Sequence, residues 1–202
     1  MKKLLTLKHW QLFILMFVVP MLAQITLMVS LFSQMMVRDQ PLPADDPAEF
    51  IGFFSSTLYI VFGVMLFLML LHFTWQYTLG SSLHKKLPES VKMNLSLFRA
   101  FLIIPFVYIV LLCFFMTDMF SGMLSNEVPN FYWFAFIIPL HLFSMFCMFY
   151  SIYFNAKSLK AVELQRPITT NDYIAEFFLL WFLPVGIWIL QPRINKLFEG
   201  EE

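Results

Sequence analysis

The side chains best suited to chemistry lie on one face of a predicted apolar helix. At about 100° per residue, a stripe of five side chains falls within roughly 120°: His141, Ser144, Cys147, Ser151 and Asn155. Imidazole, hydroxyl, thiol and amide groups inside an apolar run could hold a proton, an ion or a small polar ligand. Ionisable groups in lipid are costly and often mark sites. The stripe is therefore the first candidate ligand-binding site.

Residues at similar depth in other apolar runs could complete such a site. Gln24, Gly63 and Tyr108 lie near the middle of their runs, as His141 does. The competing interpretation is that Gln24 and His141 only form hydrogen bonds between helices, each stabilising the packing by about 0.6 kcal/mol. We assign Asp118 to the outer face and expect no charged side chain beside His141 inside the membrane. This favours packing over ligand binding.

Sequence patterns of known catalytic and metal sites are missing from the chain. It contains no His-Glu-x-x-His pair, no Gly-x-Ser-x-Gly elbow and no Walker lysine motif. The run from Gly80 to His84 offers hydroxyls and an imidazole but no orienting carboxylate, so we interpret it as a turn. An enzyme acting on lipid would need Glu176, Asp172 or His84 to converge on one pocket. We expect a non-enzymatic protein without metal or cofactor.

The composition indicates that the elements carrying these residues cross a membrane. Hydrophobic residues make up 60% of the chain and charged residues 13%, with a mean hydropathy of +0.75. A helix must contain about 20 apolar residues to cross a bilayer. Four stretches reach that length, at 10–37, 50–77, 98–124 and 131–154. We predict an all-α membrane protein of four transmembrane helices forming a single domain, 1–202.

The distribution of basic residues predicts the orientation. With the N-terminus inside, most Lys and Arg residues face the cytoplasm, whereas the outer loops are rich in Asp and Glu. The basic residues in question are Lys2, Lys3, Lys8, Lys85, Lys86, Lys92, Arg99, Lys157, Lys160 and Arg166. A basic start before an apolar run is also typical of a signal peptide, but this run is too long, so we expect a retained anchor.

A fifth apolar segment at 177–190 is short for a span. It corresponds to about 21 Å of helix and carries Pro184 and Gly186 near its middle. If the segment crossed, Arg193 and Lys196 would lie outside and reverse the charge bias. We therefore expect a re-entrant or interfacial helix, with a fifth transmembrane helix as the alternative. The residues from Thr169 to Asp172 indicate an N-cap before it.

Both ends of the chain resemble a known group of proteins. The motifs are LKHWQLF at 7–13, AKSLKAVELQ at 156–165 and EFFLLWFLPVGIWILQPRINK at 176–196. They are similar to those of a family of small multi-pass membrane proteins of Bacteroidota whose function is not known. The resemblance implies a bacterial inner-membrane location and brings no activity, cofactor or site residue with it. It marks the C-terminal module as the distinctive part.

These features lead to two functional hypotheses. The first is an accessory or interaction subunit whose C-terminal module contacts a protein partner or anionic lipid, with no role in nucleic-acid binding. The second is a carrier of a small solute or ion that uses the His141 stripe with Gln24. The oligomeric state is left open. The module residues are Lys157, Lys160, Arg166, Glu176, Pro184, Gly186, Arg193 and Lys196.

Overall fold

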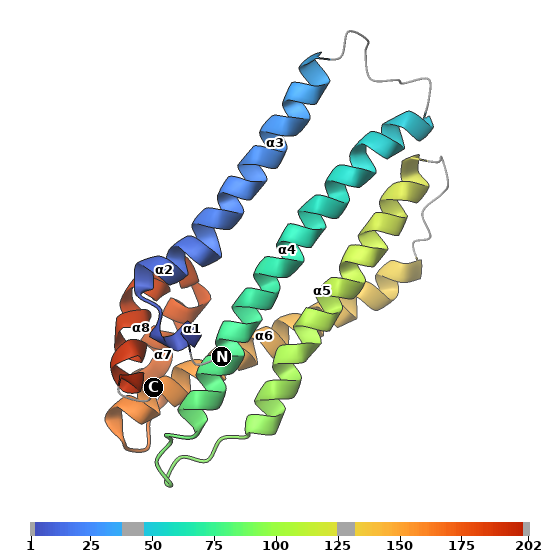
Figure 1. Ribbon diagram of the computed structural model, residues 1–202. Helices are drawn as coiled ribbons and strands as arrows, with labels where there is room; N and C mark the ends of the chain where they lie inside the picture. The colour runs from blue at the N-terminus through green and yellow to red at the C-terminus, as the bar shows by residue number, and fades with distance from the viewer. Residues whose placement is uncertain (1–2, 38–46, 125–131, 200–202) are drawn as a thin grey trace.

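The computed structural model describes residues 3–37, 47–124 and 132–199, and these ranges are almost entirely helical (Figure 1). The elements are α1 (Lys3–Thr6), α2 (His9–Phe13), the π-helical turn η1 (Ile14–Val18), α3 (Val19–Val37), α4 (Pro47–His84), α5 (Leu95–Leu124), α6 (Tyr132–Leu164), α7 (Thr170–Trp181) and α8 (Leu183–Phe198). Within the described ranges, four helices are long and apolar enough to cross a membrane: His9–Ser30, Tyr59–His84, Leu95–Met119 and Trp133–Leu164. The predicted four-span, all-α membrane fold is confirmed. The predicted outer loops at 38–46 and 125–131 lie outside the described residues.

The first span contains a wide turn that accommodates its proline. The backbone N–H of Val19 donates to the carbonyl of Ile14, five residues earlier, which defines the π turn. Pro20 follows directly, lacks an amide hydrogen and carries a ring that would crowd the carbonyl of Met16 in a regular α-helix. A π turn widens the helix at this point, so the chain continues into α3.

The fifth apolar segment contains the corner of a helical hairpin made by α7 and α8. Helix α7 ends at Trp181 and α8 begins at Leu183, because Phe182 leaves the helical conformation with ψ 59°. Pro184 lies in the first turn of α8, where its missing amide costs nothing. At about 18 Å and about 24 Å, neither helix is long enough to cross a bilayer. The chain therefore turns back at Phe182, and this hairpin fits the expected re-entrant or interfacial segment better than a fifth transmembrane helix.

The start of α7 carries the predicted cap. The backbone amide of Thr169 donates to Asp172 at 2.7 Å and the Thr169 hydroxyl donates to the same oxygen at 2.9 Å. These two bonds and the Arg166 guanidinium hold the pKa of Asp172 down at about 2. The N-cap expected between Thr169 and Asp172 is therefore confirmed. It is Thr169, and α7 begins at the next residue, Thr170.

The hydrophobic core lies at one end of the molecule, which we call the base. The short helices α1, α2, α7 and α8 gather there around the ends of α4 and α6 (Figure 1). Fully buried side chains come from every one of these segments except α7, which supplies the nearly buried Leu180. The fully buried members of this core include Leu5, Leu12, Trp75, Leu79, Leu159, Ile187 and Ile194. Away from the base, most apolar side chains are exposed to the surroundings that lipid would fill.

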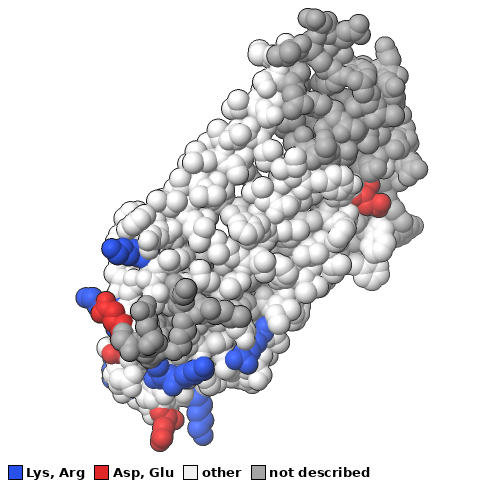
Figure 2. All heavy atoms as spheres, viewed as in Figure 1, with Lys and Arg blue, Asp and Glu red and all other residues white. Residues whose placement is uncertain are grey.

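Basic side chains share the base with this core. Figure 2 shows the Lys and Arg side chains of the visible face gathered at one end, while an acidic side chain stands near the other. Lys86 donates a hydrogen bond to the carbonyl of Leu197 and lies 4.5 Å from the centre of the Phe198 ring. The connection between α4 and α5 thus contacts the last turn of α8, where a cation is favoured by the helix dipole.

Candidate functional site

Four charged side chains fasten the hairpin to α6. Glu176 on α7 is only 3% exposed, and its Oε1 accepts from Lys160 Nζ at 3.1 Å and from Arg193 Nη2 at 2.7 Å. Arg193 also grips Glu163 with two parallel bonds, Nε to Oε1 at 2.8 Å and Nη2 to Oε2 at 2.5 Å. We call Lys160, Glu163, Glu176 and Arg193 the charge network. It joins α6, α7 and α8 in one set of contacts.

The charge network is electrically balanced. It contains two cations and two carboxylates, and a buried charge is tolerated only when it is paired and hydrogen-bonded. Burial alone would raise the pKa of Glu176, but hydrogen bonds from Arg193 and Lys160 outweigh it and hold the pKa below its usual range. The hydrogen bonds to Glu163 raise the pKa of Arg193 above its already high value. The hydrogen bonds thus outweigh the cost of burial and favour the ionised, docked state at neutral pH.

A second polar contact ties the N-terminal segment to α8. Gln191 is fully buried, and its Nε2 donates to the carbonyls of Leu5 at 3.0 Å and Leu7 at 3.1 Å. Asn195 Oδ1, one turn later, lies 2.9 Å from the same Nε2, so three acceptors share the two amide hydrogens, and Asn195 Nδ2 donates to the Leu7 carbonyl at 3.1 Å. These amides bind carbonyls in the last turn of α1 and in the break between α1 and α2. Hydrogen bonds between the N-terminal segment and α8 therefore hold the two ends of the chain together at the base.

The opposite face of the hairpin is exposed and rich in aromatic residues. Near the corner, large apolar side chains point away from the core, and Phe182 and Val185 are each 61% exposed. The others are Ile174, Phe178, Trp181, Trp188 and Ile189. Together these seven residues form what we call the hairpin face. Tryptophan and phenylalanine are the side chains that membrane interfaces and protein contacts favour.

The predicted module residues have separate roles in the structure. Lys160, Glu176 and Arg193 are brought together inside the charge network, whereas Arg166 pairs with Asp172 at 2.9 Å on the surface. Lys157 donates to the Tyr153 hydroxyl at 2.9 Å, and Lys196 is exposed. Pro184 and Gly186 lie in the first turn of α8, where a Cβ at Gly186 would come within 1.8 Å of the Leu179 carbonyl oxygen. Gly186 therefore permits the close approach of the two hairpin helices.

Three residues of this site were missed by sequence reasoning. Glu163 lies three residues after Lys160 on the same helix, and this spacing indicated its position beside the network. Gln191 and Asn195 lie four apart, so their common face was also readable. Their partners in the N-terminal segment are more than 180 residues away in the chain, and no local pattern points to them.

The predicted polar stripe faces inward over most of its length. Ser144, Cys147, Ser151 and Asn155 are all buried, but His141 is exposed. The His141 Nδ1 lies 3.0 Å from the Tyr108 hydroxyl, which joins α6 to α5. Tyr108 thus meets His141 as the depth comparison suggested. Gln24 lies exposed on α3, a helix whose described contacts are chiefly with α4 and η1, so the structure does not bring it to the stripe.

The inner part of the stripe belongs to a second hydrogen-bonded chain. Asn155 Nδ2 donates to Gln76 Oε1 at 3.2 Å, and Gln76 Nε2 lies 2.7 Å from His72 Nε2 on the same helix. Gly80 allows the approach, since a Cβ there would come within 2.6 Å of Asn155 Oδ1. This contact between α4 and α6 fits the packing interpretation of the stripe.

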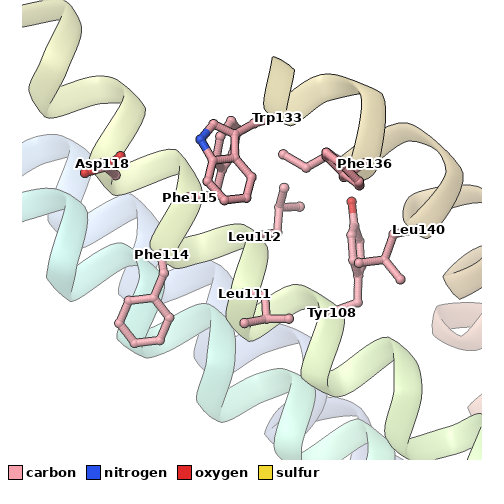
Figure 3. Close-up of a pocket in the computed structure, with 10 residues that line it drawn as sticks. Tyr108, Leu111, Leu112, Phe114, Phe115, Asp118, Trp133, Phe136 and Leu140 are labelled. Atoms are coloured by element: carbon pink, nitrogen blue, oxygen red, sulfur yellow. The ribbon is translucent and has the colours of Figure 1, made fainter. Parts of the chain in front are cut away.

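Two cavities flank α5 away from the base. One, of about 400 Å³, lies between α5 and α6 and is lined mainly by apolar side chains (Figure 3). Figure 3 shows Tyr108 at one end of the lining group and Asp118 at the other. The second cavity, of about 660 Å³, lies between α4 and α5 and also includes Asp118. Asp118 is exposed and lies near the end of α5 that is away from the base, at the last turns of the span predicted over 98–124.

In the described ranges, no three His, Cys, Asp or Glu side chains lie close enough to bind a metal ion together. Comparisons with protein-family models, curated proteins and solved structures gave no match to this chain.

Proposed function

We propose that this protein is a non-enzymatic accessory or interaction subunit of a bacterial inner membrane, with its N-terminus in the cytoplasm. The single observation that carries the proposal is the charge network. Four balanced charges hold a short hairpin in a fixed position on α6. A plain membrane anchor has no need for a buried ion network, because burying charges contributes little stability compared with apolar packing. Fixed positioning of a surface is what such a network supplies.

The surface presented in this way is the hairpin face. Phe178, Trp181 and Trp188 are each 48% exposed, and the exposed Lys196 lies on α8 nearer the C-terminal end. Large aromatic side chains contribute most of the energy in protein contacts and lose little conformational freedom when they bind. We assign the face to a protein partner in the same membrane. Lys160 and Arg193 position it rather than touch the partner, because their charges are already paired.

The location and orientation are supported by charge. Basic side chains concentrate at the base, and the cytoplasmic ends of membrane proteins carry the excess of Lys and Arg (Figure 2). The bacterial inner membrane is proposed only because the terminal motifs resemble those of small membrane proteins of Bacteroidota. The base would then lie on the cytoplasmic side and the Asp118 end toward the periplasm.

Site-specific photo-cross-linking in intact cells tests the interaction. A photoreactive residue replaces Phe178 or Trp188 on the hairpin face. In a third variant it replaces Phe136 of α6, which is 72% exposed against 48% for each hairpin residue. We expect one and the same protein adduct from both hairpin positions and none from Phe136. Arg193→Lys, which keeps the charge but loses the two-pronged grip on Glu163, should weaken the adduct, whereas Arg166→Lys should not. Lipid adducts alone at all three positions would contradict the proposal.

A second function, transport of a small solute or ion, is favoured by one observation. The Tyr108 and His141 pair lies beside the cavity between α5 and α6, whose lining also includes Asp118. A proton or ion could be exchanged between these groups. Flux into proteoliposomes should then be lost with His141→Ala and with Tyr108→Phe while the protein remains folded. Unchanged flux in both variants would exclude this route.

A further inference from the structure

Helix α3 is covered on one side only in the described part of the chain, where its contacts are chiefly with α4 and η1. It stands at the edge of the molecule beside α4 (Figure 1). Its contact side contains the buried Pro20 and the partly buried Ala23 and Leu27. On another side, Met21 is 56% exposed and Met28 is 58% exposed, with Gln24 exposed between them. The contact with α4 therefore leaves this second side of the helix open.

Gln24 is the polar group on that side. Other polar side chains of α3 are satisfied by their own helix, since Thr26 donates to the Leu22 carbonyl at 2.8 Å and Ser33 donates to the Ser30 carbonyl at 2.9 Å. The Gln24 amide makes no hydrogen bond to any residue in the described part of the chain. In a bilayer core there is no water to satisfy it, so the amide has a strong preference for a partner helix.

The spacing of these residues specifies the geometry of that partner. Met21, Gln24 and Met28 follow one another at intervals of three and four, and the sequence continues the same alternation with Leu31 and Met35. Intervals of three and four form the seam of two helices that coil around each other with a left-handed twist. A single polar residue within such a seam fixes the register of the pair.

We propose that α3 pairs through this seam with α3 of a second copy of the protein. Both copies insert in the membrane in the same direction, so their α3 helices run parallel, as the seam requires. A glutamine amide both donates and accepts, so across a two-fold axis Gln24 of one copy satisfies Gln24 of the other. The seam is therefore complementary to itself. This inference rests on α3 alone and is independent of any partner bound by the hairpin.

Disulfide cross-linking in native membranes tests the geometry. In a background with Cys113→Ala and Cys147→Ala, single cysteines replace the seam residues Met21 and Met28. Leu22 and Val29, the next residues along the helix, are matched controls because they are similarly exposed, at 54% and 61%, but face another direction. We expect covalent dimers from positions 21 and 28 and few from 22 and 29. Equal cross-linking at all four positions, or none at any, overturns the proposal.

The role of the amide is tested with purified protein reconstituted alone into vesicles of phosphatidylethanolamine and phosphatidylglycerol. Single-molecule photobleaching counts dimers as lipid dilutes the protein. Gln24→Leu should weaken dimerisation by about tenfold, equivalent to two modest hydrogen bonds in lipid, and Gln24→Asn should weaken it less. If the wild-type protein stays monomeric at high density, or if cells yield only adducts with another protein, the partner is not a second copy.

Discussion

At the scale of single residues, the value of a charge in this protein depends on how deeply it is buried. Glu176 and Asp172 lie four residues apart on α7, and both accept hydrogen bonds from an arginine. The Asp172 pair lies at the surface, where water screens it, whereas Glu176 is almost fully enclosed. Removing one member of an enclosed pair leaves the partner charge buried and unpaired. This lowers the stability of the fold far more than losing a surface pair does.

The first prediction concerns Glu176→Gln, which preserves size and removes charge. Arg193 and Lys160 would then share one carboxylate, Glu163, within the network. Because both cations are partly exposed, we expect a loss of about 2 kcal/mol, below the range for a fully buried pair. Urea unfolding in detergent, followed by circular dichroism, measures the loss. Arg166→Ala is the control and should change stability little, so equal stability of Glu176→Gln and the parent protein would contradict this account.

The second prediction compares two glycines. A methyl group at Gly186 would meet the backbone of Leu179 at 1.8 Å, and a carbonyl cannot move aside as a side chain can. Gly186→Ala should therefore cost about 4 kcal/mol or more, or prevent the hairpin from closing. At Gly63 a Cβ has nothing within 4 Å, so Gly63→Ala should be neutral or stabilise by up to about 1 kcal/mol. Thermal unfolding of both variants decides, and a tolerated Gly186→Ala would mean that the helices pack less closely.

At the scale of elements, the spans were readable from sequence and the contacts between them were not. Length and hydropathy locate a transmembrane helix directly, because lipid leaves the backbone no other option. Depth in the membrane was a poorer guide, since it says nothing about which helices are neighbours. It paired His141 with both Tyr108 and Gln24, and the structure joins only the first of these, through the described contact between α5 and α6.

The hairpin shows the same limit at closer range. Pro184 and Gly186 indicated a break in the last apolar segment, but the position of the corner at Phe182 determines which charges meet. Arg193 and Glu163 are separated by 30 residues and become partners only once the chain has turned there. Sequence reasoning grouped Lys160, Glu176 and Arg193 in one module and expected Lys160 and Arg193 to contact a partner, whereas in the structure the three side chains pair with one another.

The third prediction is that acid releases the hairpin as a unit. The pKa of Glu176 lies below its ordinary value in the folded protein, so its pairing stabilises docking fully above that ordinary value of about 4.3. The stabilisation is lost as the pH falls through the lower, folded-state pKa. We therefore expect a docked hairpin between about pH 5 and 8 and increased mobility below about pH 4.

Electron paramagnetic resonance measures this release. A spin label attached at Lys196→Cys, on the exposed side of α8, should gain mobility in acid, while a label at Val107→Cys on α5 should not. This acid-induced gain in mobility should disappear in Glu176→Gln, whose label should already be more mobile at neutral pH. A gain of the same size in that variant would assign the transition to other carboxylates.

At the scale of the whole molecule, the buried apolar core and the charged side chains are concentrated at the same end, the base. The base contains the buried core, the charge network and the hydrogen bonds from Gln191 to the N-terminal segment. The remainder of each span presents apolar side chains outward. A bundle built in this way is held together from one side of the membrane. The orientation of the chain then decides which compartment meets the hairpin.

The fourth prediction is that the base faces the cytoplasm. In a background without Cys113 and Cys147, single cysteines replace Asp45 in the first predicted outer loop, Ser90 between α4 and α5, and Lys196 on α8. The excess of Lys and Arg at the base should keep Ser90→Cys and Lys196→Cys inside. A membrane-impermeant maleimide should then label Asp45→Cys in intact cells and reach the other two only after permeabilisation.

External labelling at position 196 but not at position 90 would mean that the hairpin crosses the bilayer after all. Equal labelling at 45 and 90 would place both ends of α4 in one compartment, which a membrane-spanning helix does not allow.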